Sequence, residues 1–404
     1  MTPDGQGGTV ELVCGGPAAG GGMVARDGDG RVVFVRHAAP GERVLAAVTE
    51  RHASWARADA VEVLTASPDR RGAPCPYARP GACGGCDYQH LDPVAQRAAK
   101  AERLKDQLRG LAGLDLPVEV RAATAGADGL RTRTRVRMAV DADGRLAMRV
   151  HGSHELVPID DCLLAASGLD VAALAGRRWS PDSELEVVRL AGAPEATLVR
   201  HVAGPRGRST EEVLEGPSVQ VTTVGDLAYE VSAGVFWQVH ELAPALLVEA
   251  VLDGLALSAG DGVLDLYCGA GLFTKAAAVV VGRRGRVVGV DASRAAVADA
   301  RRNLAGQPWA RVVTAKVDAR SVRDAPPGLR AAVLDPPRRG VDRGALLALC
   351  ETGVERVVSV SCEPSTFSRD LRALLDAGFT VESVAGWDLF EQTEHVECVA
   401  VLSR

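Results

Sequence analysis

The chain has 404 residues, of which 47% are hydrophobic and 24% charged, and its formal net charge is −6. This length predicts more than one domain, and the composition excludes a chain that is disordered throughout. The negative charge excludes a polycation, so binding to nucleic acid would depend on local basic patches. No apolar run is long enough to span a membrane and no secretory signal pattern is visible, so we expect a cytoplasmic protein without a membrane segment.

The first segment, residues 1–68, alternates short apolar runs with glycine-containing turns. We expect strands at residues 9–13, 31–35, 43–48 and 60–64. Short strands separated by such turns predict a small β-barrel of the oligonucleotide-binding type.

The second segment, residues 69–228, carries a cluster of three cysteines at Cys75, Cys83 and Cys86. The nine cysteines of the chain are too unevenly spaced for a secreted disulfide framework, and in a reducing compartment a cluster of this kind favours a metal site. The same segment contains a predicted helix at residues 93–111, a candidate for packing on the third segment, followed by β-rich sequence.

Four arginines alternate with other residues in the middle of this segment, at Arg131, Arg133, Arg135 and Arg137. In a strand they would share one face and form a dense row of positive charge. The alternative is a solvated sheet edge, where such charges discourage aggregation.

The third segment, residues 229–404, alternates predicted strands with helices. The expected strands are residues 262–266, 286–290, 312–317, 331–334, 354–361, 379–384 and 396–402. This alternation predicts an α/β fold with a doubly wound, mostly parallel sheet.

A nucleoside pocket is predicted where the first of these strands enters a Gly-x-Gly turn, at Gly269 and Gly271. Asp291, Asp318 and Asp335 follow later strands and would line the carboxyl edge of the sheet, although any one of them could instead cap a helix. The third glycine of the dinucleotide fingerprint is missing and an aspartate precedes the turn, which favours S-adenosylmethionine over a pyrophosphate.

A cysteine and a glutamate suggest covalent chemistry. Cys362 follows an apolar strand and precedes Glu-Pro, and Glu397 lies at the start of the last strand. The thiol could attack an electron-poor carbon while the carboxylate moves a proton. The alternative is a cysteine that only packs in the core.

Several motifs together resemble the S-adenosylmethionine-dependent RNA uracil-5 methyltransferases, which make 5-methyluridine in 23S rRNA or tRNA. They are Asp-Pro-Pro-Arg-Arg-Gly at 335–340, Val-Ser-Cys-Glu-Pro-Ser-Thr-Phe-Ser-Arg-Asp at 360–370, Asp-Leu-Phe-Glu-Gln-Thr-Glu-His-Val-Glu at 388–397, and Phe-Trp-Gln-Val-His at 236–240. Residues 34–42 resemble the family's TRAM domain, a small barrel associated with RNA binding. The resemblance covers nearly the full length.

The resemblance implies a Rossmann-like class I methyltransferase domain in which Cys362 is the nucleophile and Glu397 the base. Its cofactor residues would be Gln238, Tyr267, Gly269, Gly271, Asp291, Asp318 and Asp335. It also implies a [4Fe–4S] cluster held by Cys75, Cys83, Cys86 and Cys162, although spacing by itself leaves zinc open as the alternative. The arginine row at 131–137 and the barrel would bind RNA phosphates.

The chain departs from the family pattern at several positions. Seven residues separate Cys75 from Cys83 where the pattern has five, His240 and Glu363 stand in place of Asn, and Glu391 stands where Pro is common. Leu272 follows the glycine turn where a polar residue is frequent. No catalytic group is lost.

Taken together, the expected activity is methylation of uracil C5 in 23S rRNA, with tRNA as the alternative. A non-catalytic RNA-binding protein stapled by a metal, and a small-molecule methyltransferase, are weaker alternatives. No feature indicates an obligate protein partner.

Overall fold

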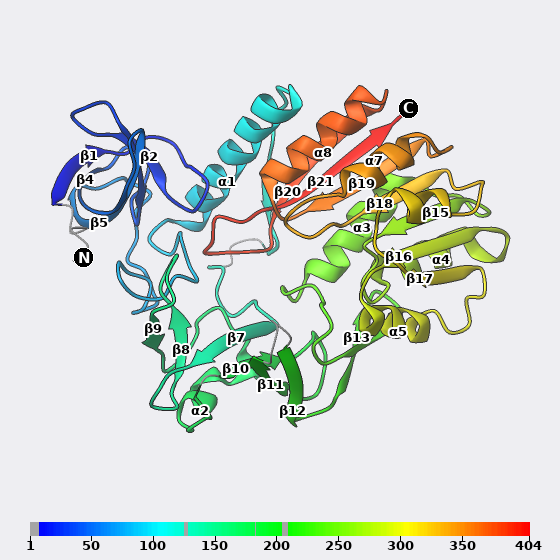
Figure 1. The fold of residues 1–404 in the computed structure, drawn as a ribbon, viewed down its shortest axis with the longest axis horizontal. Coiled ribbons are helices and arrows are strands. Elements are labelled where there is room, and N and C mark those ends of the chain that lie inside the picture. Colours follow the sequence, from blue (N-terminus) through cyan, green and yellow to red (C-terminus); the bar gives the residue numbers. More distant parts are fainter. Residues whose placement is uncertain (1–7, 125–127, 182, 204–208) are drawn as a thin grey trace.

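The computed structural model describes residues 8–124, 128–181, 183–203 and 209–404. Figure 1 shows an amino-terminal β-sheet at the left, an antiparallel sheet at the bottom and a larger sheet flanked by helices at the upper right. No helix among the described residues is long and apolar enough to cross a membrane.

The amino-terminal sheet has five strands in the order β1-β4-β5-β3-β2. Their bounds are β1 Thr9–Val13, β2 Met23–Arg26, β3 Val32–Arg36, β4 Arg43–Arg51 and β5 Trp55–Thr65. All pairs are antiparallel except β3 with β5. The sequence missed β2, which is only four residues long, and placed the start of β5 five residues late.

The central sheet has six antiparallel strands in the order β12-β11-β10-β7-β8-β9. The strands are β7 Arg135–Val140, β8 Leu146–Arg149, β9 Leu156–Pro158, β10 Ser183–Val188, β11 Thr197–Ala203 and β12 Ser209–Glu215. A 3-10 turn (Ser167–Leu169) and the short helix α2 (Val171–Ala175) lie between β9 and β10. A separate hairpin, β13 (Val219–Val224) and β14 (Leu227–Ser232), leads to the larger sheet.

The larger sheet has eight strands in the order β17-β16-β15-β18-β19-β21-β20-β6. The strands that the sequence predicted are β15 Gly262–Leu266, β16 Arg286–Asp291, β17 Ala310–Thr314, β18 Ala331–Leu334, β19 Arg356–Ser361, β20 Thr380–Asp388 and β21 Glu397–Ser403. The helices between them are α3 Ala243–Leu255, α4 Leu272–Val281, α5 Arg294–Asn303, α6 Ala319–Arg323, α7 Arg343–Cys350 and α8 Pro364–Asp376, with a 3-10 turn at Gly282–Arg284. Among the described strands of this larger sheet, only β21 runs antiparallel to its neighbours. The predicted doubly wound, mostly parallel sheet is therefore confirmed.

The eighth strand comes from the second segment of the sequence. β6 (Val120–Ala122) pairs in parallel with β20, and helix α1 (Pro93–Gln107), continued by a turn at Leu108–Ala112, packs beside α8 (Figure 1). Residues 93–122 are therefore part of the larger sheet and its helical layer, and the antiparallel sheet begins after them.

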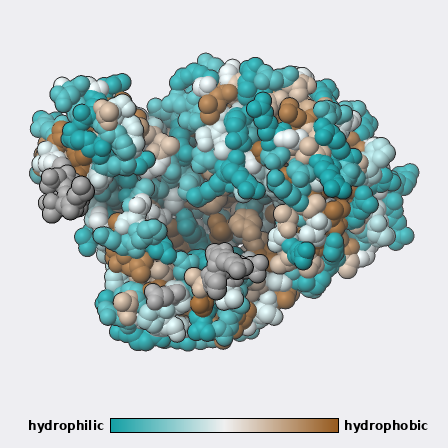
Figure 2. Space-filling view, viewed as in Figure 1, coloured by the Kyte–Doolittle hydropathy of each residue, from teal (hydrophilic) through white to brown (hydrophobic). Residues whose placement is uncertain are grey.

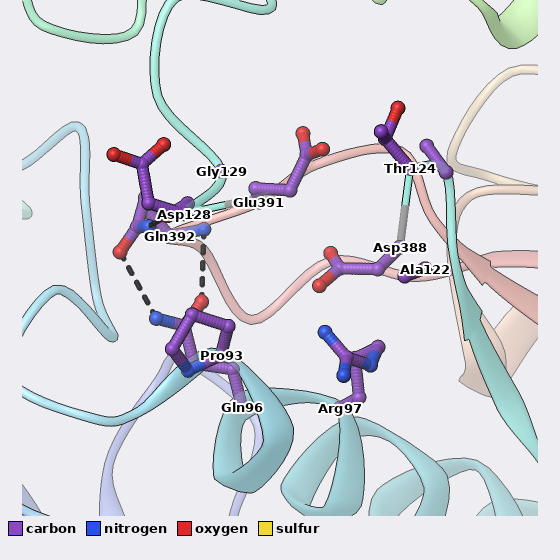
Figure 3. A pocket seen from close by; sticks show the side chains of 11 residues that line it. Pro93, Gln96, Arg97, Ala122, Thr124, Asp128, Gly129, Asp388, Glu391 and Gln392 are labelled. Carbon is purple, nitrogen blue, oxygen red and sulfur yellow. Dashed lines mark hydrogen bonds between the residues drawn. The ribbon is translucent and has the colours of Figure 1, made fainter. Parts of the chain in front are cut away.

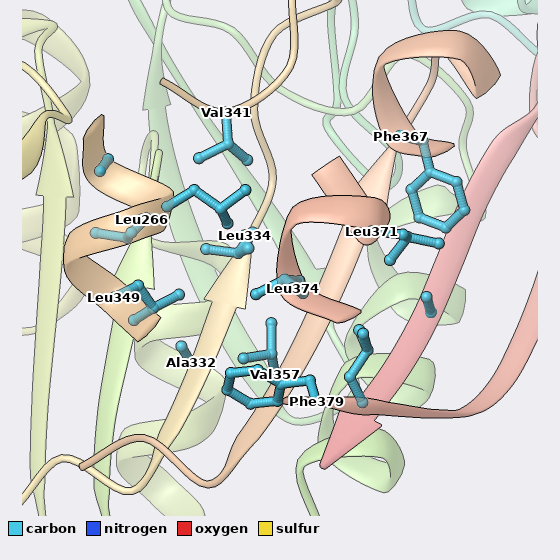
Figure 4. Packing of buried hydrophobic residues seen from close by; sticks show 14 of the residues in the cluster. Leu266, Ala332, Leu334, Val341, Leu349, Val357, Phe367, Leu371, Leu374 and Phe379 are labelled. Carbon is cyan, nitrogen blue, oxygen red and sulfur yellow. The ribbon is translucent and has the colours of Figure 1, made fainter. Parts of the chain in front are cut away.

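Apolar side chains from the strands and helices cover both faces of this sheet. One face packs against α7 and α8, where Leu334, Val357 and Leu371 are completely buried (Figure 4). Burial of a side chain of this size contributes about 1.5–3 kcal/mol. The sheet is thus a rigid base for groups at its carboxyl edge.

Candidate active site

A cavity of about 1030 Å³ opens at the carboxyl edge of the larger sheet. The carboxyl ends of β15, β16, β18 and β19 all meet this edge, because these strands are parallel. Figure 2 shows that the face of the molecule between the three sheets is hollowed near its centre, where hydrophobic residues gather. Seven of the predicted catalytic and cofactor residues line the cavity: Gln238, Tyr267, Gly269, Asp291, Asp335, Cys362 and Glu397.

The turn after β15 is held in a left-handed conformation. Tyr267, Gly269 and Gly271 have φ angles of 66°, 53° and 89°, a region that favours glycine. The Gly269 N–H donates to Asp291 Oδ2 at 3.0 Å, so the turn orients the carboxylate that ends β16. Gly271 begins α4 outside the cavity wall, and a side chain there would meet Ala300 at 3.2 Å.

Gln238 and Asp335 meet inside the cavity. The Gln238 amide donates to Asp335 Oδ2 at 3.5 Å. Burial, with a smaller contribution from the charge of Asp265, raises the pKa of Asp335 to about 7. A cation bound next to Asp335 would offset this rise, because it would stabilise the ionised carboxylate.

Asp318 has a different place from the one expected. β17 ends at Thr314, and Asp318 caps α6 by accepting hydrogen bonds from the backbone N–H groups of Arg320 and Ser321. It does not appear among the residues that line the cavity. Both capping hydrogen bonds are accepted by Asp318 Oδ1.

Strand pairing brings Cys362 and Glu397 together. Ser361 pairs with Cys398 in the antiparallel ladder of β19 and β21, so the next position along places Cys362 opposite Glu397. Burial, and then the charge of Glu397, raise the pKa of the Cys362 thiol to about 12. Burial, and then the charge of Asp335, also raise the pKa of Glu397 well above its usual range.

Arg338 supplies positive charge beside the thiol. Its charge and its hydrogen bond lower the pKa of Cys362, opposing the effect of burial. The same guanidinium lies 2.8 Å from Nε2 of His395, and burial followed by the charge of Arg338 lowers the pKa of His395 to about 3. Cys362 also directly precedes Glu363 and Pro364, which begin α8, and the positive end of a helix favours a thiolate.

The arginine row differs from the expectation. Only Arg135 and Arg137 belong to β7, whereas Arg131 precedes the strand with a φ of 58°. Three of the four pair with carboxylates: Arg131 with Asp161 at 2.5 Å, Arg135 with Glu186 at 3.5 Å and Arg137 with Glu184 at 2.8 Å. The four do not form one exposed row, but Arg133 and Arg135 line the cavity.

The predicted metal ligands lie as free thiols at Cys75, Cys83, Cys86 and Cys162. Nitrogen donors already point at two of the sulfur atoms: Gly85 N lies 3.4 Å from the sulfur of Cys83, and Gln89 Nε2 lies 3.1 Å from that of Cys86. Within the described residues, however, no group of three or more His, Cys, Asp or Glu side chains is arranged to hold a metal ion.

Comparison with known proteins gives the same reading of the carboxyl-terminal motifs. The model of the tRNA (uracil-5-)-methyltransferase family matches residues 328–404, and that of protein-L-isoaspartate(D-aspartate) O-methyltransferase matches residues 223–325. An uncharacterized RNA methyltransferase of Streptomyces avermitilis is 41% identical, covering 97% of each chain. A 23S rRNA (uracil(1939)-C(5))-methyltransferase of Chromohalobacter salexigens is 33% identical over 94% of this chain and 86% of its own. The chain belongs to the RNA uracil-5 methyltransferase family.

A solved structure agrees with this fold. The crystal structure of Pyrococcus abyssi tRNA (uracil-54, C5)-methyltransferase in complex with S-adenosyl-L-homocysteine has a TM-score of 0.75 and 22% identity, covering 97% of this chain and 99% of that one. Like that protein, this methyltransferase has the class I fold.

The cavity suits the S-adenosylmethionine on which RNA uracil-5 methyltransferases depend. Both oxygens of Asp291 are held by backbone N–H groups, from Gly269 and Ser293, which fixes the carboxylate at the end of β16. The raised pKa values of Asp335 and Glu397 mark a buried acidic environment that a sulfonium would stabilise.

The sequence missed the contacts that hold the loop between β20 and β21, which ends in the methyltransferase's Glu397. Figure 3 shows Gln392 of this loop facing Gln96 of α1, and Asp388, at the end of β20, facing Arg97. His240 Nε2 lies 3.0 Å from Glu391 Oε1, so two departures from the family pattern bind each other. The available signal was the spacing of Gln96, Lys100 and Arg103, which places three polar side chains on one face of a helix.

Proposed function

We propose that this enzyme makes 5-methyluridine by covalent catalysis, with Cys362 as nucleophile and Glu397 as base. The observation that carries the proposal is the placement of both groups in the wall of one cavity, opposite each other at the ends of β19 and β21. The same cavity contains the glycine turn and the carboxylates suited to the cofactor.

The reaction begins when the thiol adds to C6 of the uracil. Cys362 attacks as the thiolate, after its proton has passed to solvent. A bond forms between Sγ and C6 while the C5–C6 double bond opens, and C5 becomes an enolate-type nucleophile. Bound S-adenosylmethionine supplies the methyl group. Glu397, in its ionised form, then removes the proton from C5, and the bond between Sγ and C6 breaks to regenerate the cysteine. Arg338 favours the thiolate both when Cys362 attacks C6 and when it is released.

The target uracil must be unpaired or flipped out of its helix, because the thiol and the methyl donor reach its ring from the cavity wall. Arg133 and Arg135 line the cavity and are the arginines of the predicted row best placed beside the target nucleotide. The amino-terminal sheet, with its TRAM-like motif, would bind flanking RNA.

We propose 23S rRNA as the substrate, supported by the relative named for that activity and by the combination of an amino-terminal β domain with a cysteine cluster. Transfer RNA is the alternative, because the family model that matches residues 328–404 carries that name.

A [4Fe–4S] cluster held by Cys75, Cys83, Cys86 and Cys162 remains a proposal, with zinc as its alternative. It is supported by the family resemblance and by the donors that point at Cys83 and Cys86. The thiols would have to converge when the metal binds. No step of the reaction involves the metal, since methyl transfer moves no net electrons.

Glu397→Gln tests the mechanism and the substrate together. The amide cannot take the C5 proton, so this variant should accumulate a protein–RNA adduct that survives denaturing electrophoresis. Transcripts of 23S rRNA and of tRNA are offered separately with S-adenosylmethionine, and the one that is captured is the substrate. Glu397→Gln combined with Cys362→Ala should capture neither. Methyl transfer by the single variant without any adduct would assign the base role to another group.

A further inference from the structure

The loop from Asp388 to Glu397 is held in place mainly by groups outside it. Within the loop, the hydrogen bonds involve only Phe390, Thr393 and His395. Helix α1 supplies the principal external contacts: Lys100 Nζ binds Asp388 at 2.5 Å and the Phe390 carbonyl at 3.0 Å. The loop that leads into Glu397 therefore depends on a helix about 290 residues earlier in the chain, while strand pairing holds Glu397 itself.

Arg103, one turn further along α1, contacts both halves of the catalytic site. Its Nη2 atom lies 3.1 Å from Glu363 Oε1, and its Nη1 atom lies 3.0 Å from Glu394 Oε2. Glu363 directly follows Cys362, and Glu394 precedes Glu397 by three residues. One guanidinium thus joins the segment that carries the nucleophile to the loop that leads into the strand of the base.

This arrangement is largely shielded from water. The Arg103 side chain is 5% exposed, and its two carboxylate partners are 19% and 12% exposed. If the guanidinium that lies between them were removed, the Glu363 and Glu394 carboxylates would repel each other in a poorly solvated site. The nucleophile's turn and the base's loop would then move apart.

Glu363 makes this link a property of this chain rather than of the general motif, because the family pattern has Asn after the nucleophile. A neutral amide could accept one hydrogen bond from Arg103 but could not form an ion pair. Glu363 also caps α8, accepting from Ser365 N at 3.4 Å and from Ser365 Oγ at 3.0 Å. Ser365 and Arg103 thus donate to the same carboxylate oxygen, Glu363 Oε1.

We propose that Arg103 is a positioning residue for methyl transfer, which holds Cys362 and Glu397 at their working separation through Glu363 and Glu394. It touches neither the cofactor nor the uracil. The inference rests on the proposed function of Cys362 and Glu397.

The test compares Arg103→Gln, Arg103→Lys and Arg109→Gln. Arg109 is the matched control, since it lies just beyond α1, is 59% exposed and pairs only with Asp106 among the described residues. Initial rates are measured as transfer of tritiated methyl groups from S-adenosylmethionine to the RNA transcript that Glu397→Gln captures. Binding of S-adenosylmethionine is measured separately by equilibrium dialysis. A displacement on the ångström scale costs roughly 100-fold in rate.

We expect Arg103→Gln to lower kcat roughly 10- to 100-fold, with KM for both substrates and cofactor binding within about twofold of wild type. Arg103→Lys should recover part of the loss, because an ammonium can pair with one carboxylate but not bridge both. Arg109→Gln should match wild type. An unchanged kcat in Arg103→Gln would overturn the proposal, as would a loss explained entirely by weaker cofactor binding.

Glu363→Gln provides a second variant should Arg103→Gln fail to fold. The amide oxygen still caps α8, so the expected loss in kcat is smaller, roughly 3- to 10-fold, and adding Arg103→Lys should not multiply it. Multiplicative losses would contradict a shared link.

RNA made with 5-fluorouridine separates the covalent mechanism from the positioning role of Arg103. Its C5 fluorine cannot be removed as a proton, so the adduct persists. If wild type forms none, the covalent mechanism fails; if wild type and Arg103→Gln form it equally fast, only the positioning role fails.

Discussion

The chemistry of the site depends on a cysteine whose surroundings oppose its ionisation. Burial and Glu397 raise the pKa of the Cys362 thiol to about 12, whereas Arg338 lowers it. The sequence identified Cys362 as the candidate nucleophile, because it lies in a short motif at the end of a strand. It also paired the thiol with Glu397, but it could not show that burial and this carboxylate raise the pKa of the thiol.

Alkylation of Cys362 by iodoacetamide should report this environment. The thiolate is the reactive form and the thiol's pKa lies well above neutrality, so the rate should rise about tenfold per pH unit from pH 7 to 9 without a plateau. Arg338→Gln removes a group that lowers the pKa, and should slow alkylation at each pH. Mass spectrometry of the peptide containing Cys362 separates it from the other cysteines. A plateau below pH 8 would contradict the raised pKa.

Among the elements, α1 and its packing on the third segment were predicted, but the burial of its polar residues was not. The helix buries Gln96, Lys100 and Arg103 together with Leu104. In sequence these polar residues resemble the solvated face of an amphipathic helix. They are buried because the loop before β21 presents Asp388, Gln392 and Glu394 to them. Lys100 illustrates this, with its side chain 0% exposed and its partner Asp388 only 3% exposed.

Lys100→Met should destabilise the fold by about 3–5 kcal/mol, because it leaves the Asp388 carboxylate buried without its partner. Lys105→Met, at an exposed position of the same helix, should change the free energy of unfolding by no more than about 0.5 kcal/mol. Urea unfolding followed by circular dichroism measures both. Adding Asp388→Leu to Lys100→Met should restore much of the loss. Equal stability of the two lysine variants would show that the buried pair is unimportant.

On the scale of the whole molecule, the loop before Glu397 joins the three sheets. Gly20 N, from the amino-terminal domain, donates to Glu394 Oε2 at 2.7 Å, and Thr132 Oγ1, close to the central sheet, donates to Glu391 Oε2 at 3.1 Å. The backbone N–H groups of Asp87 and Tyr88 donate to the Gln392 carbonyl at 2.9 and 3.0 Å. Since Asp87 directly follows Cys86, ordering of the cysteine segment would also order this loop.

If a metal fixes that segment, Cys83→Ser should lower the melting temperature by at least about 4 °C relative to wild type. Cys350→Ser, on α7 and far from the cluster in sequence, is the control and should have little effect. The visible absorption and sulfide content of anaerobically purified protein distinguish an iron–sulfur cluster from zinc. Protein free of both metals, with equal melting temperatures for the two variants, would refute the metal site.

The doubly wound sheet, the glycine turn with Asp291 and the candidate pair Cys362 and Glu397 could all be predicted from the sequence, because periodicity and strand-end motifs are local signals. Tertiary structure decided the rest. It paired most of the arginine row with carboxylates, used Asp318 as a helix cap, added β6 to the larger sheet and buried Arg103 between Glu363 and Glu394. In each case the partner lies far along the chain or depends on where an element ends. The sequence around a charged residue does not identify the residue with which it will form an ion pair.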